Sequence, residues 1–80
     1  MNFHSSDGEH FLGVRTNRRG ETEVVYDNAG RRRVIFRLEG QPPANDALER
    51  ALRQSVESDN VLGALRASLV AQNIDFDLAD

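Results

Sequence analysis

The fold is decided in one stretch of the chain, Asp27-Asn28-Ala29-Gly30-Arg31-Arg32-Arg33-Val34-Ile35-Phe36-Arg37-Leu38. Its first four residues are the strongest hairpin signal in the sequence and predict a type I turn with a glycine bulge. The alternation that follows predicts a strand over residues 32–38. The side chains expected to face a core are Val34, Phe36 and Leu38. Those expected on the opposite face are Arg33, Ile35 and Arg37.

Two more strands are expected before this stretch. Residues 10–16 and 22–26 alternate in the same way, and residues 17–20 between them contain the Asn and Gly of a turn. Residues 10–38 therefore predict a three-stranded antiparallel β-meander, preceded by a flexible N-terminal segment, 1–9. The inward side chains are Leu12, Val14, Val24 and Tyr26. The outer face receives Phe11, Gly13, Arg15, Glu23 and Val25.

Two helices are expected within residues 45–72. The segment Gly40-Gln41-Pro42-Pro43 ends the sheet pattern, because proline cannot donate to a strand ladder. Asn45 or Asp46 can cap the first helix, and apolar residues recur at helical spacing on both sides of a break at 58–60. Gly63 weakens the second helix, and Asn73 is a suitable left-handed stop. The predicted fold class is α+β.

The C-terminal residues 74–78 alternate apolar and acidic side chains. One interpretation is a short fourth strand that closes the core of the same chain. The other is a tail that adds a strand to a partner or to a second copy. The pattern leaves both open.

Length and composition indicate one small globular domain, residues 1–80. The chain is 39% hydrophobic and 29% charged, which is ordinary for a folded domain, and it contains no cysteine. Disulfides and thiolate ligands are therefore excluded. No apolar run could cross a membrane, and the first residues lack a signal-peptide pattern, so a cytoplasmic location is expected.

Charge is segregated along the chain. Residues 15–37 carry seven of the ten basic residues, all arginine, and have a net charge of +4. Residues 38–80 have a net charge of −5, and the whole chain has −3. The exclusive use of arginine fits either the base composition of a genome or selection for bidentate contacts to carboxylate or phosphate.

No motif in the chain indicates a particular reaction. His4, Asp7, Glu9 and His10 resemble metal ligands, but their spacing matches no established signature, and a polar loop is expected instead. His4, Ser5 and Asp7 are close in sequence, which is not triad geometry. The glycines form no phosphate-binding motif. We therefore expect neither catalysis, nor a metal, nor a cofactor.

The sequence favours a non-catalytic accessory module that acts by binding another protein, as a homodimer. The expected contacts are Arg15, Arg33, Arg37, Ile74, Asp75, Phe76 and Asp77. The alternative is a nucleic-acid-binding regulator, because arginines on hairpins can follow phosphates. Its contacts would be Arg18, Arg19, Arg31, Arg32 and Arg33. Only Phe11 is available there for base stacking, which weakens the alternative.

Overall fold

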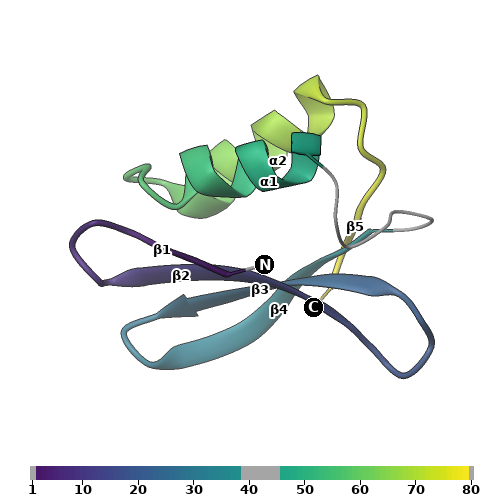
Figure 1. Cartoon of the computed structure of the whole chain (residues 1–80), viewed down its shortest axis with the longest axis horizontal. Helices are drawn as coiled ribbons and strands as arrows, with labels where there is room; N and C mark the ends of the chain where they lie inside the picture. Colours follow the sequence, from purple (N-terminus) through teal and green to yellow (C-terminus); the bar gives the residue numbers. More distant parts are fainter. Residues whose placement is uncertain (1, 39–45, 80) are drawn as a thin grey trace.

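An antiparallel sheet carries two helices on one of its faces (Figure 1). The computed structural model describes residues 2–38 and 46–79. Within them the strands are in the order β1-β2-β3-β4-β5. Their bounds are β1 Asn2–His4, β2 His10–Thr16, β3 Thr22–Asn28, β4 Arg31–Leu38 and β5 Asp77–Leu78. The helices are α1 Asp46–Ser55 and α2 Val61–Ala71.

The α+β class is confirmed, but the meander has four strands where the sequence predicted three. The added strand is β1, which pairs with β2 from Asn2 opposite Gly13 to His4 opposite Phe11. The sequence pattern did not predict β1, because this strand is only three residues long and is followed by a polar turn. That turn contacts the segment between the two helices, because Glu57 accepts hydrogen bonds from the backbone and hydroxyl of Ser6, at 2.7 and 3.1 Å.

The hairpin between β3 and β4 differs from the predicted turn. The strands pair as far as Asn28 opposite Arg31, so only Ala29 and Gly30 form the loop. Both have positive φ, 55° and 85°, as in a type I′ turn. This turn matches the right-handed twist of the strands better than the predicted type I turn with a bulge. This turn requires Ala29 to adopt the left-handed conformation, which is unfavourable for a residue with a Cβ atom.

A β-bulge changes which face the first half of β4 presents. Val24 pairs with Phe36, but Val25 pairs with Val34, so Ile35 is an extra residue. Ile35 joins the core at 7% exposure. The predicted faces of Arg33, Val34 and Ile35 were therefore wrong. Val34 lies opposite Val25 on the outer face, and Arg33 lies opposite Tyr26 on the helix-bearing face.

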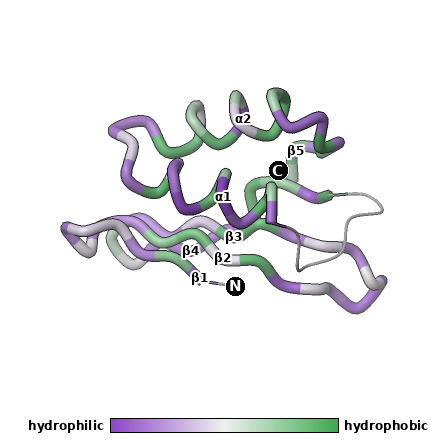
Figure 2. Tube along the Cα trace, turned by 45° about the horizontal axis from the view of Figure 1, so that its top comes forward, coloured by the Kyte–Doolittle hydropathy of each residue, from purple (hydrophilic) through white to green (hydrophobic). Residues whose placement is uncertain are grey.

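The core lies between the sheet and the helices, where apolar residues of both layers meet (Figure 2). Burial of leucine side chains is its main source of stability, roughly 2 kcal/mol for each fully buried side chain. The most buried members from the sheet are Leu12, Val24, Phe36 and Leu38. Those from the helices are Leu48, Ala51, Leu52, Leu65 and Leu69.

Both helices form where the apolar spacing predicts them. The predicted break at Gly40–Pro43 and the alternative cap Asn45 lie outside the described residues. Asn60 caps α2, because its side-chain oxygen accepts from the Gly63 amide at 3.1 Å. Asn73 has φ 57°, which confirms the predicted left-handed stop. Among the described residues neither helix is long and apolar enough to span a membrane.

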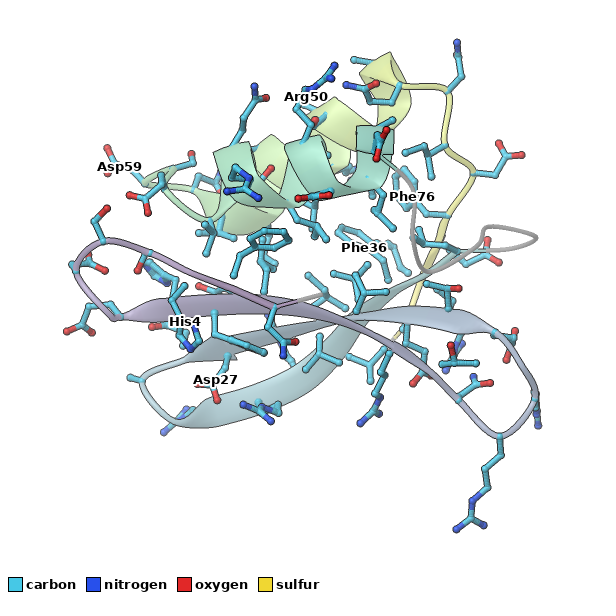
Figure 3. The ribbon with its side chains drawn as sticks, in the orientation of Figure 1. His4, Asp27, Phe36, Arg50, Asp59 and Phe76 are labelled. Atoms are coloured by element: carbon cyan, nitrogen blue, oxygen red, sulfur yellow. The ribbon has the colours of Figure 1, made fainter. Side chains whose placement is uncertain are left out.

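The C-terminal tail returns to the sheet of its own chain. Ile74 is buried at 7% exposure, and the ring of Phe76 packs edge-on against Phe36 at 5.0 Å (Figure 3). Asp77 and Leu78 then pair with Arg37 and Phe36 as β5. The short fourth strand of the first interpretation is thus present, now as the fifth strand of the sheet.

Candidate functional site

The outer face of the sheet is uncovered, but its charges pair with one another. Glu23 on β3 accepts a hydrogen bond from Arg15 on β2 at 3.0 Å and lies 3.9 Å from Arg37 on β4. Asn17 donates to its second oxygen at 3.3 Å. Two arginines expected to contact a partner are therefore neutralised within the chain.

Glu23 is ionised in spite of its burial. Desolvation raises the pKa of its carboxyl, but hydrogen bonds from Arg15 and Asn17, with the charges of Arg15 and Arg37, together lower the pKa below its ordinary value. The group behaves as the anionic centre of a structural network.

Phe11, the aromatic residue expected to be open for stacking, is engaged. The Arg32 guanidinium lies 4.8 Å from the centre of its ring, and the His4 ring lies 5.0 Å away. Gly13 makes room, since a Cβ there would meet the Phe11 ring at 2.8 Å. Arg32 also lies 3.4 Å from Asp27. The Phe11 ring, which was expected to be open for base stacking, is thus covered by a side chain of the outer face.

The N-terminal polar cluster is used in a turn. Asp7 accepts from the Ser5 hydroxyl and from the Glu9 amide, and these bonds lower the pKa of Asp7, the Ser5 bond most. Ser5 in turn accepts from the backbone amide of His10. The His10 ring nitrogen lies 2.9 Å from the hydroxyl of Tyr26. In the described part of the chain no three His, Cys, Asp or Glu residues gather as metal ligands.

The arginines of the nucleic-acid alternative do not form one surface. Arg18 and Arg19 lie in the β2–β3 turn, whereas Arg31 begins β4 at the opposite end of the sheet (Figure 1). The bulge register puts Arg32 on the outer face and Arg33 on the face that bears the helices. Of these residues, Arg32 already has an acidic partner.

The four tail residues expected at a partner contact differ in burial. Ile74 and Phe76 face inward, so the chain that carries them also covers them. Asp75 and Asp77 are exposed. A dimer held by an exchanged tail would have to remove Phe76 from Phe36 in each copy.

A groove between β4 and α2 remains open. Its floor is apolar, from Ile35, Phe36 and Leu62, and its volume is about 230 Å³. Leu78, at 59% exposure, forms one side. Arg33 and Arg66 line it, and no ion pair joins either arginine to an acid of the described residues. We call it the β4–α2 groove.

Of the predicted contact residues only Arg33 lies in this groove, and it was expected on the other face of the sheet. Leu62 and Arg66 share a helix face, because they are four residues apart. Their position beside Arg33 depends on the bulge, which the regular alternation of the sequence does not predict. Leu78 appeared only as the end of the tail pattern.

Larger depressions exist but are polar. One of them, about 450 Å³, lies beside the β1–β2 turn and is lined by His4, Glu9, His10, Asp27 and Arg32 among others. Several of its side chains already contact one another, since Arg32 pairs with Asp27 and also lies over the ring of Phe11. The β4–α2 groove differs because it combines an apolar floor with cations that lack acidic partners in the described structure.

Comparisons with known proteins identify no relative. No family model matches the chain, and no curated protein or solved structure matches it. The case for a function therefore rests on the geometry.

Proposed function

We propose that this protein is a non-catalytic interaction module that binds a segment of another protein in the β4–α2 groove. The observation that carries the proposal is Leu78, a large apolar side chain exposed beside an apolar floor. A volume of about 230 Å³ is below the several hundred Å³ typical of small-molecule sites. It suits one or two side chains of a docked polypeptide.

The groove is preferred to the outer sheet face for an electrostatic reason. On the outer face Glu23 and Asp27 neutralise Arg15, Arg37 and Arg32. Binding there would have to compete with these pairs. In the groove, Arg33 and Arg66 offer charge without first losing an acidic partner among the described residues.

The test is selection of peptides on the immobilised protein from a displayed random library. We expect enriched peptides that compete for one site and bind about tenfold more weakly to Leu78→Ser, because an apolar anchor is removed. Val70→Ser is the matched control: Val70 is 61% exposed but does not line the groove. Failure to enrich peptides, or equal binding by both variants, would refute the proposal.

The homodimer expected from the sequence is tested on the same samples. Light scattering behind size exclusion gives the mass of the native chain and of Leu78→Ser. A monomer in both leaves the groove free for another protein. A dimer that Leu78→Ser dissociates would mean that a second copy occupies the groove, which would overturn the proposal of a different partner.

A further inference from the structure

The edge of β4 beside the groove lacks a neighbouring strand over half its length. β5 pairs only with Phe36 and Arg37, and the Ala79 amide adds one bond to the Ile35 carbonyl at 3.0 Å. Beyond this point no strand of the described chain pairs with the outer edge of Arg31–Val34. Such an edge presents unpaired backbone donors and acceptors to an incoming strand.

We propose that this edge and the β4–α2 groove together bind an extended acidic segment of another protein, which adds a strand in line with β5. This inference rests on the proposed function and names the chemistry of its partner. Backbone pairing beside Arg31–Val34 would supply affinity, and the groove would select the side chains.

The side chains required follow from the register. Arg33 lies on the helix-bearing face of β4, beside the apolar floor and near Arg66 of α2. Side chains two residues apart in a strand point to the same face. A bound strand with an apolar residue and a carboxylate two positions apart therefore presents both side chains on one face. The apolar side chain would then contact the groove floor, and the carboxylate would contact the arginines.

Charge argues against a second copy of this chain as the occupant. Pairing of two β4 edges would bring Arg31, Arg32 and Arg33 of one copy beside the same arginines of the other, and like charges across strands are destabilising. The β1 edge offers Asn2, Phe3 and His4, none of which is a carboxylate. The tail acids belong to a segment whose Phe76 packs in its own chain. An acidic partner complements the edge, whereas this chain repels itself there.

The experiment measures the binding of a short labelled peptide by fluorescence anisotropy. One face of the probe carries a leucine followed by two glutamates at alternate positions, and threonine occupies the other face. Its two controls replace the glutamates by glutamine or methylate alternate backbone amides. We expect each control to bind at least about tenfold more weakly, because one loses the charges and the other the strand pairing.

Variants of the protein locate the site. Arg33→Glu and Arg66→Glu should each weaken the acidic probe about tenfold and leave the glutamine probe unchanged or tighter. Arg50→Glu is the matched control, because Arg50 is exposed on α1 and points away from the sheet (Figure 3). All variants are exposed substitutions, and circular dichroism checks that they fold.

The outcomes separate the two proposals. Equal binding of the glutamate and glutamine probes, or equal effects of Arg33→Glu and Arg50→Glu, would overturn the acidic partner. If the library still yields peptides that depend on Leu78, the interaction module survives with a different ligand. If neither the probe nor the library binds, both proposals fail.

Discussion

Glu23 lies on the uncovered face of the sheet, yet only 7% of its surface is exposed. Arg15 and Arg37, which are 58% and 47% exposed in their side chains, cover it and hold its charge. At the scale of single residues, the arginines thus differ in their surroundings. Arg15 and Arg37 stabilise the outer face, whereas Arg33 forms no ion pair with an acid of the described residues.

The pKa of Glu23 makes the stability of the fold depend on pH. Because its folded pKa lies below the ordinary value of 4.5, the carboxylate stabilises the fold above that pH, and the contribution is lost as pH falls through the folded pKa. Glu23→Gln should lower the free energy of unfolding by about 1 kcal/mol at neutral pH. This value allows for solvent screening of the exposed arginines. The difference from the native chain should shrink in acid.

Urea unfolding between neutral pH and about pH 3 measures both effects. Glu49→Gln is the control, since Glu49 forms an exposed pair with Arg53 at 2.8 Å, and such pairs contribute about 0.3 kcal/mol. A gap between Glu23→Gln and the native chain that stays constant down to the lowest pH would show that the charge of Glu23 is not the cause.

At the scale of elements, short polar segments set the positions of the helix and strand ends. Asn60 caps α2, and Gly63 leaves room for its side chain, since a Cβ at Gly63 would lie 2.6 Å from the Asn60 amide nitrogen. The glycine that weakens the helix by propensity therefore accommodates its cap. The bulge at Ile35 acts at the same scale, because one extra residue moves Arg33 to the other face of the sheet.

The coupling between cap and glycine predicts non-additive stability. Asn60→Ala should lower the free energy of unfolding by about 1 kcal/mol, because the cap is lost. Gly63→Ala should raise the free energy of unfolding by up to about 1 kcal/mol in the Asn60→Ala background, where its methyl group has space. The increase should be smaller in the native chain. A double-mutant cycle by chemical denaturation measures the difference. Equal gains in both backgrounds would refute the coupling, and Gln54→Ala controls for a general effect of alanine on helix stability.

At the scale of the whole molecule, two layers divide the surface into areas of different character. The helices cover one sheet face, the outer face is neutralised by cross-strand pairs, and the two hairpin turns with arginines lie at opposite ends (Figure 1). The arginines that are close together in the sequence therefore do not form one basic surface. The nucleic-acid alternative requires such a surface.

This arrangement predicts weak binding of nucleic acid. With a net charge of −3 and arginines dispersed over both faces, any complex with random single-stranded DNA should disappear at about 150 mM salt. Anisotropy titrations at low and moderate salt measure this. A complex that persists at moderate salt and is abolished by Arg32→Glu with Arg33→Glu would favour the nucleic-acid regulator instead.

The sequence by itself determined most elements of this protein, with β1 as the exception. Alternation predicts β2, β3 and β4, helical spacing predicts α1 and α2, and Asn73 predicts the end of α2, because these signals are local and repeat along the chain. The tertiary structure alone decided how the faces are used. The bulge depends on the fit of β4 to β3 beneath the helices, and it brings Arg33, Leu62 and Leu78 together. Because that fit is made by residues distant in sequence, only the folded chain creates the β4–α2 groove.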